Sequence, residues 1–283
     1  MKNIILILAI IQLSFSCSPQ KKCETSLNTI NNDFKIHNEF KTYFDSCQVN
    51  GSIVIFDNSK KEWIVSDTIE IKKETLPAST FKIINLLIAL ETKTIKDENE
   101  IVKWIGKTDT IKYGNRPEIY HDMTVKEAFK VSAGWVFIEL AKKIGKEEYK
   151  KYLSKCSYGN LNLTEKDDDF WNFGSFGISP INQVEFLKKL YDNKLPFSKR
   201  NIDIVKKVMI SEQVNEYTIS AKTGWTREND TNTGWWVGYL KTKNNTYFFA
   251  TRLLQSRIKN RDDFGSCRKE ITKKIFKELQ IIN

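Results

Sequence analysis

The chain has 283 residues, of which 40% are hydrophobic, enough for the core of one large domain or of two closely packed lobes. Its formal net charge is +10, but the basic residues are scattered among 35 acidic ones and do not alternate with aromatics in a nucleic-acid-binding pattern. We therefore expect a globular protein with a lysine-rich surface and no nucleic-acid partner.

The N-terminus has the features of an export signal. Lys2 precedes an apolar run over residues 4–15, and small residues lead to Cys17. This pattern predicts a signal peptide over residues 1–17, and the run is too short to span a membrane. The polar residues 18–32 then predict a tether.

Cys17 leaves two outcomes open. Residues 13–17 resemble a loose bacterial lipobox, in which the cysteine is lipid-modified, although Ser14 stands where the best lipoboxes carry leucine. Lipid on Cys17 would anchor the protein to a bacterial membrane without spanning it, whereas ordinary cleavage would release it. In both cases we expect a periplasmic protein.

The remaining cysteines and the histidines do not suggest a metal site. No pair of cysteines has the CxxC spacing, and the two histidines form no HExxH motif. Neither a metal site nor a Ser-His-Asp triad is therefore expected. Export permits a disulfide, and Cys23 with Cys47 is the nearest pair, but the sequence does not decide the pairing.

Strands are predicted near the start of the chain and helices follow them. Residues 51–56 are rich in β-branched side chains, and residues 63–65 look like their hairpin partner across a turn at 57–60. Apolar residues then recur at helical spacing from 80 to about 92.

Further helices are marked by their capping residues. Thr124 is a suitable N-cap, and a helix over 136–144 ends at Gly145. Ser179 followed by Pro180 predicts the start of a helix that runs to about 192.

The last third of the chain returns to strands. Residues 217–222, 235–240 and 247–254 predict consecutive antiparallel strands, with turns at 224–233 and 243–245. The chain then ends in an amphipathic helix, whose predicted range is 266–279.

This order predicts an α/β (α+β) fold with a single domain over residues 33–283. Strands from both ends of the chain would build one antiparallel sheet lobe, about 33–77 and 211–283, covered by the terminal helix. Residues 78–210 would form an inserted all-helical lobe, and a ligand site is expected in the cleft between the lobes.

Two short motifs suggest a serine nucleophile. In STFK (79–82), Ser79 and Lys82 share one face at the start of a helix, and apolar neighbours would lower the pKa of the lysine so that it can act as a base. In KTG (222–224), Lys222 and Thr223 offer a cation and a hydroxyl to an anion, and Gly224 allows close approach. Each motif alone is weak, but the ordered pair is typical of β-lactamases and penicillin-binding proteins.

Three further segments narrow the resemblance. SAG (132–134), YGN (158–160) and a tryptophan segment, WNFG (171–174), lie between the two motifs. Together the five segments resemble the class D, oxacillinase-type serine β-lactamases over roughly residues 47–283. The resemblance implies the penicillin-recognising serine hydrolase fold and hydrolysis of the β-lactam ring of penicillins, which confers antibiotic resistance.

The resemblance also implies roles for individual residues. Ser79 would be the acylated nucleophile, and Lys82 would carry carbon dioxide as a carbamate that acts as general base, held by the indole N–H of Trp171. No other cofactor is expected. Ser132 would relay a proton to the departing lactam nitrogen, supported by Lys222.

Substrate binding would use the end of the KTG strand. Thr223 and Gly224 would bind the substrate, and the backbone N–H groups of Ser79 and Trp225 would form the oxyanion hole. An arginine would pair with the substrate carboxylate. Arg268 is the best positional match, with Arg252 and Arg257 as rivals.

Gly134 departs from the family, which has valine at this place. Without this apolar wall, we expect weaker carbamylation of Lys82 or easier access of water to it. Substrate range would depend on the loops at 104–120 and 226–233.

Other readings of the same motifs remain. A β-lactam sensor or other non-hydrolysing penicillin-binding protein of this fold would be acylated and stay so, and a transpeptidase would act on cell-wall peptides. A class A β-lactamase would have SDN and a separate glutamate base, against which SAG and YGN argue.

Overall fold

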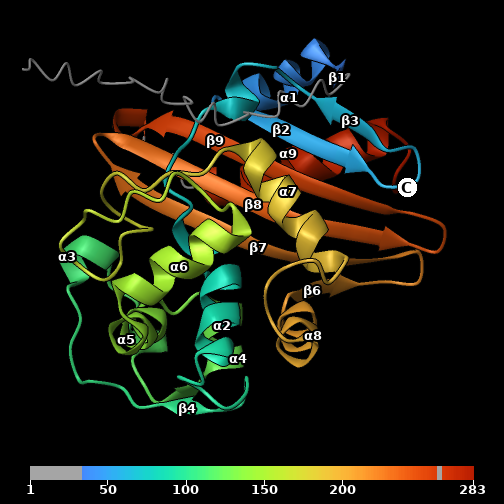
Figure 1. The fold of residues 1–283 in the computed structure, drawn as a ribbon. Coiled ribbons are helices and arrows are strands. Elements are labelled where there is room, and N and C mark those ends of the chain that lie inside the picture. The colour runs from blue at the N-terminus through green and yellow to red at the C-terminus, as the bar shows by residue number, and fades with distance from the viewer. Residues whose placement is uncertain (1–33, 260–262) are drawn as a thin grey trace, which may run out of the picture. The chain divides into compact units, whose positions relative to one another are not determined.

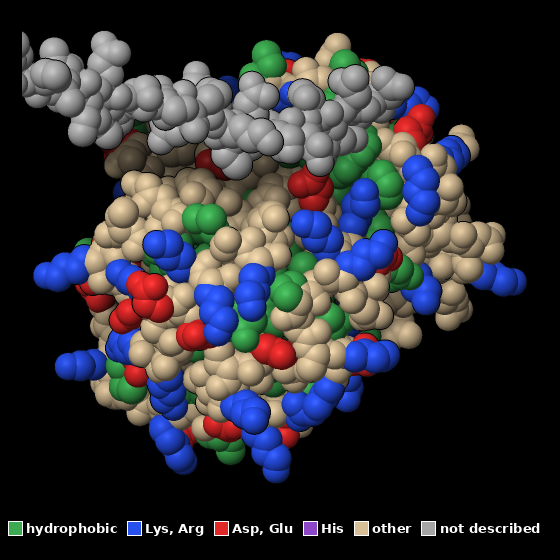
Figure 2. Space-filling view, viewed as in Figure 1, with side chains coloured by type: hydrophobic (Ala, Val, Ile, Leu, Met, Phe, Trp, Pro, Cys, Tyr) green, Lys and Arg blue, Asp and Glu red, His purple; other side chains and the backbone are tan. Residues whose placement is uncertain are grey.

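The structure, a computed structural model, describes residues 34–259 and 263–283 (Figure 1). The predicted signal peptide (1–17) and tether (18–32) lie outside these residues and stay predictions. In the described part of the chain, no helix is both long and apolar enough to cross a membrane. On the face shown in Figure 2, lysine and arginine side chains are spread out with acidic ones among them.

A seven-stranded sheet carries the domain, with the strand order β1-β3-β2-β9-β8-β7-β6 (Figure 1). Strands β1 and β3 are parallel and the other neighbouring pairs are antiparallel. Their bounds are β1 (Phe34–Ile36), β2 (Asn50–Asp57), β3 (Glu62–Val65), β6 (Ile210–Gln213), β7 (Tyr217–Glu228), β8 (Thr231–Thr242) and β9 (Thr246–Ser256). The prediction of one largely antiparallel sheet built from both ends of the chain is confirmed.

The turn predicted over 224–233 is wrong, because β7 and β8 continue to a tight turn at Asn229 and Asp230. Both residues have positive φ, 45° and 58°, which Asn and Asp tolerate better than most residues. Gly224, which suggested the turn, instead permits close packing. A Cβ at this residue would lie 2.8 Å from the carbonyl oxygen of Pro77.

The two faces of the sheet are covered by different helices. Alternation along β2 turns Ile53 toward one apolar cluster and Val54 toward another. The cluster with Ile53 is completed by α1 (Lys41–Ser46) and the terminal helix α9 (Phe264–Glu278), which confirms the predicted cover.

Helix α7 (Pro180–Tyr191) covers the opposite face and contacts β2, β8 and β9, although its residues fall in the range predicted for the helical lobe. Its Val184 and Leu187 belong to the cluster with Val54, so burial on the sheet decides its place. The capping prediction is confirmed, since Ser179 Oγ accepts a hydrogen bond from the N–H of Asn182.

The helical lobe surrounds α2, and the other helices predicted for the middle of the chain are found there. The α-helices are α2 (Lys82–Glu91), α3 (Thr110–Tyr113), α4 (Val125–Val131), α5 (Gly134–Ile144), α6 (Lys146–Cys156) and α8 (Lys199–Val208). Thr124 caps α4 by accepting a hydrogen bond from the N–H of Glu127, and Gly145, with φ 78°, ends α5. The remaining short elements of the described residues are β4 (Ile101–Val102), β5 (Met123–Thr124), and the 3₁₀ helices η1 (Asn38–Phe40), η2 (Glu70–Lys72), η3 (Ala78–Phe81), η4 (Pro117–Ile119) and η5 (Arg257–Lys259).

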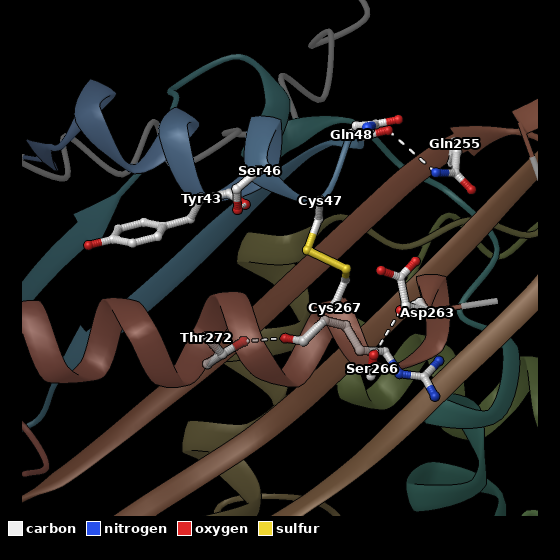
Figure 3. Close-up of a disulfide and its surroundings, with 10 residues drawn as sticks. Tyr43, Ser46, Cys47, Gln48, Gln255, Asp263, Ser266, Cys267 and Thr272 are labelled. Carbon is white, nitrogen blue, oxygen red and sulfur yellow. Dashed lines mark hydrogen bonds between the residues drawn. A yellow bond between two sulfur atoms is a disulfide. The ribbon is translucent and has the colours of Figure 1, made fainter. Parts of the chain in front are cut away.

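One disulfide joins Cys47 to Cys267 (Figure 3). Cys47 follows α1 and Cys267 lies in the first turn of α9, 220 residues later. The suggested pairing of Cys23 with Cys47 is therefore wrong, because the packing of α1 on α9 brings Cys267, distant in the sequence, to Cys47.

Candidate active site

Ser79 and Lys82 lie where the 3₁₀ helix η3 passes into α2. Lys82 Nζ donates a hydrogen bond to Ser79 Oγ across 2.9 Å. The preceding residue, Ala78, has φ 50°, a left-handed conformation that costs energy for a residue other than glycine. The N–H of Ala78 donates to the carbonyl oxygen of Trp171, which helps to hold this sharp turn.

Lys82 is buried without a carboxylate partner in the described residues. Its exposed fraction is 1%, and its Nζ lies 5.1 Å from the centre of the Phe137 ring. Burial, and secondarily the positive charge of Arg116, lowers the pKa of Lys82 from 10.5 to about 7. A substantial fraction of the lysine is therefore a free amine at neutral pH, able to accept a proton from Ser79.

Trp171 packs against the segment that carries this pair. Its ring stacks on Phe81, with ring centres 4.9 Å apart and planes 9° from parallel. Its indole Nε1 is buried and has no hydrogen-bond partner among the described residues. Because a buried N–H without a partner is costly, this atom suits an oxygen that the polypeptide does not supply. A carbamate on Lys82 fits that requirement.

The YGN segment supports the tryptophan segment from outside the cavity. Tyr158 is buried against Phe81 and Phe186. Gly159 has φ 69°, and Asn160 donates from Nδ2 to the carbonyl oxygen of Ser175. These residues therefore fix backbone geometry rather than face a substrate.

Strand β7 holds the same segment from the other side. Thr226 Oγ1 donates to the carbonyl oxygen of Asn172 across 2.6 Å, and the N–H of Gly174 donates to Glu228 Oε1 across 2.8 Å. The sequence motifs did not indicate Thr226 or Glu228, because these contacts depend on the unexpected length of β7.

Ser132 and Lys222 form a second hydroxyl–amine pair. Lys222 Nζ donates to Ser132 Oγ and, across 3.1 Å, to the carbonyl oxygen of Thr223. Ser132 has φ 57° where it ends α4, so its backbone is also in the left-handed region. Burial, and then repulsion from Lys82, holds the pKa of Lys222 well below its ordinary value.

The KTG segment forms one wall of the cavity. Thr223, Gly224 and Trp225 line it along β7, together with Ser79. A Cβ at Gly224 would lie 3.3 Å from the Cβ of Ala78 and closer still to the carbonyl oxygen of Pro77, so glycine lets the strand approach the serine turn.

Of the three candidate arginines, Arg268 lines this cavity. Its Nη1 donates to the carbonyl oxygen of Gly224 across 2.7 Å, and burial lowers its pKa to about 10. Arg252 is fully buried and paired with Glu70, and Arg257 lies in η5 away from the cavity lining. Arg268 directly follows the disulfide cysteine Cys267, and its hydrogen bond to Gly224 connects the first part of α9 to β7.

The cavity has a volume of about 480 Å³ and brings Ser79, Lys82 and Ser132 together with Thr223 and Arg268. Trp171 and Lys222 do not line the cavity themselves. Trp171 contacts Phe81 and Ala78, and Lys222 contacts Ser132. The loops expected to set substrate range do contribute to the lining, with Tyr113 and Arg116 from one and Arg227 from the other. No motif singled out these three side chains.

Gly134 lines the same cavity as the first residue of α5. A Cβ at Gly134 would meet no atom within 4 Å, so the space that a larger side chain would fill is open. This agrees with the expectation of a missing apolar wall.

The chain was compared with known proteins. The family described as "Penicillin binding protein transpeptidase domain" matches residues 49–277. Beta-lactamase OXA-10 of Pseudomonas aeruginosa is 42% identical over 210 residues, covering 73% of this chain and 77% of that protein. Beta-lactamase OXA-48 of Klebsiella pneumoniae is 35% identical over 250 residues, covering 88% of this chain and 91% of that protein.

Solved structures give the same answer. The crystal structure of a class D β-lactamase from Sebaldella termitidis shares 40% identity with a TM-score of 0.82, covering 89% of this chain and all of that one. The class D β-lactamase FUS-1 from Fusobacterium nucleatum shares 30% identity with a TM-score of 0.80. With motifs, fold and relatives in agreement, the chain belongs to the class D serine β-lactamases.

Proposed function

We propose that this protein hydrolyses the β-lactam ring of penicillin-type antibiotics through an acyl-enzyme on Ser79 and thereby confers resistance. The observation that carries the proposal is the 2.9 Å hydrogen bond between Lys82 Nζ and Ser79 Oγ inside a cavity that also holds Ser132, Thr223 and Arg268. Ser79 Oγ attacks the lactam carbonyl carbon, the carbon–nitrogen bond breaks, and water later hydrolyses the ester.

The low pKa of Lys82 supports its role at the base position. A free amine can react with carbon dioxide, and the buried indole N–H of Trp171, which has no partner among the described residues, supports a role in holding the added oxygen. A carbamate on Lys82 would supply an anionic general base for both the acylation and the deacylation steps. Trp171 would keep it oriented, and the apolar surroundings would limit its exposure to water.

The remaining polar residues have complementary tasks. Ser132, hydrogen-bonded to Lys222, would pass a proton to the lactam nitrogen as its bond to carbon breaks. Arg268 and Thr223 would bind the ring carboxylate of the substrate. The backbone N–H groups of Ser79 and Trp225 would stabilise the oxyanion, and Gly224 would leave room for the substrate.

Steady-state hydrolysis of nitrocefin and of a penicillin tests this function. Repeated turnover is expected, together with the mass of one carbon dioxide on Lys82 in bicarbonate buffer. One-to-one trapping as a stable acyl-protein would instead establish the alternative, a non-hydrolysing penicillin-binding or sensor protein of the same fold. The absence of a carbon dioxide adduct from an active enzyme would refute the carbamate and leave the amine as base.

We also propose that the protein is exported to the periplasm, because residues 1–17 have the pattern of a signal peptide. Fractionation and mass spectrometry of the mature N-terminus test this. Lipid on Cys17 would establish an anchor, whereas an unmodified new N-terminus would establish ordinary cleavage.

A further inference from the structure

Two arginines at the edge of the cavity have no task in the reaction described above. Arg116 lies between α3 and η4 in the helical lobe, whereas Arg227 lies near the end of β7. We call this pair the mouth arginines. The guanidinium carbon of Arg227 lies 4.9 Å from the centre of the Trp225 ring, so aromatic stacking holds it without neutralising its charge.

Arg116 is held by groups that leave its charge available. Its Nη2 donates to the carbonyl oxygen of Val131, next to Ser132, across 3.1 Å. Its Nε donates to Glu118 Oε1 across 2.9 Å, but both side chains are exposed, by 40% and 61%, so water screens this pair. Its Nη1 has no hydrogen-bond partner in the described part of the chain.

The charge of Arg116 also acts on Lys82 and Lys222. It contributes, after burial, to lowering the pKa of Lys82, and it acts in the same direction on Lys222. The guanidinium is therefore near enough to the reacting groups to influence a bound substrate.

The rest of the lining leaves this positive charge unbalanced. Five basic side chains line the cavity, and none of the described lining residues is an aspartate or glutamate: Lys82, Lys112, Arg116, Arg227 and Arg268. Lys112 is paired with two aspartates, a substantial fraction of Lys82 is uncharged at neutral pH, and the proposed function assigns Arg268 to the ring carboxylate. The mouth arginines are the basic groups that remain.

We propose that Arg116, assisted by Arg227, binds a second carboxylate on the substrate and makes the enzyme selective for β-lactams with an anionic side chain. The inference rests on the proposed function. In a penicillin, the ring carboxylate and the acylamino side chain lie at opposite ends of the fused rings. A substrate with its carbonyl at Ser79 and its ring carboxylate at Arg268 therefore directs its side chain away from Arg268. Arg268 contacts β7 through Gly224, whereas Arg116 lines the cavity from the helical lobe.

A matched pair of substrates tests this directly. Carbenicillin differs from benzylpenicillin by one carboxylate on the side chain, so the ratio of their kcat/KM values isolates the second anion. Arg116→Gln should lower this ratio by about threefold to tenfold, chiefly through the KM of carbenicillin, because an exposed charge pair contributes modestly. Arg116→Lys should restore part of it, and Arg227→Gln should lower it less.

Two controls separate local binding from general charge. Arg200→Gln removes an arginine of α8 that does not line the cavity, and it should leave the ratio unchanged. In the wild-type protein the ratio should fall as sodium chloride is added, since salt screens exposed charges.

Loss of activity toward both substrates in equal proportion in Arg116→Gln, with an unchanged ratio, would overturn the inference. A wild-type protein that hydrolyses neither substrate would contradict the proposed function instead. In that case the same ratio, taken from acylation rates measured by intact mass, still decides whether Arg116 recognises the side-chain carboxylate.

Discussion

The cavity has a buried part and an exposed part, and the basic side chains of the two parts differ in how far solvent reaches them. In the reaction centre, which comprises Ser79, Lys82, Ser132 and Lys222, both lysines are at most 5% exposed and their pKa values are lowered by burial. The mouth arginines, Arg116 and Arg227, keep contact with solvent and keep their charge. Burial thus provides a base where chemistry needs one, and exposure preserves cations where an anion can be recognised.

Removal of the nucleophile is the strongest test of the buried part. Ser79→Ala should lower kcat by roughly 10⁴-fold or more, because no other hydroxyl in the reaction centre is paired with Lys82. Nitrocefin hydrolysis and the mass of the acyl-protein measure this. Retained turnover by a correctly folded variant would refute the assignment of the reaction centre.

Removal of the buried indole donor should have the next largest effect. Trp171→Phe keeps an aromatic ring against Phe81 but deletes Nε1, and we expect turnover to fall by about tenfold to a hundredfold, the usual consequence of losing a hydrogen bond to a charged group. Added bicarbonate should restore part of it.

Trp135→Phe is the matched control. Trp135 is also buried beside the cavity, but its Nε1 already donates to the carbonyl oxygen of Ile119. A bicarbonate response that is the same in both variants would contradict the role of Trp171.

The pH dependence connects the two parts of the cavity. Below pH about 7, Lys82 is protonated and can neither react with carbon dioxide nor accept the proton of Ser79, so kcat/KM without bicarbonate should fall up to tenfold per pH unit. Arg116→Gln removes a positive charge, which raises the pKa of Lys82. The acid limb of the pH profile should therefore move to higher pH by less than about one pH unit. An acid limb at the same pH in both proteins would show that the charge of Arg116 does not affect the pKa of Lys82.

The same shift affects stability. The folded pKa of Lys82 is depressed, so between pH about 7 and 10.5 the unfolded chain binds more protons than the folded one. The destabilising contribution of this lysine therefore has its full size below pH about 7 and is lost as the pH rises to 10.5. The free energy of unfolding should rise with pH across that window. In Lys82→Met, measured by denaturant titration, this rise should be smaller.

The smallest expected effect concerns the open space at Gly134. A Cβ there would meet no atom within 4 Å, and a valine would restore the apolar wall that the family has. We expect the wild-type protein to respond to bicarbonate severalfold more strongly than Gly134→Val, which would hold its carbamate better. An equal response in the two proteins would count against any influence of Gly134 on Lys82.

The candidate residues of the site could be predicted from the sequence because their contacts depend on local spacing. Ser79 and Lys82 meet since one helical turn separates them, and Lys222, Thr223 and Gly224 share one strand. The alternation that defines strands and the capping residues that define helices also act over a few residues, and those predictions are confirmed at β2, α5 and α7.

What the sequence left open depends on contacts between distant segments. Three arginines competed for one role, and only the packing of α9 on the sheet separates Arg268 from the buried ion pair of Arg252. The disulfide partner of Cys47 and the presence of both mouth arginines in one cavity likewise depend on segments that are distant in the sequence and close in the fold. Spacing along the chain indicated the candidate reactive residues, and tertiary packing decided which charges surround them, because burial and distance are properties of the folded chain alone.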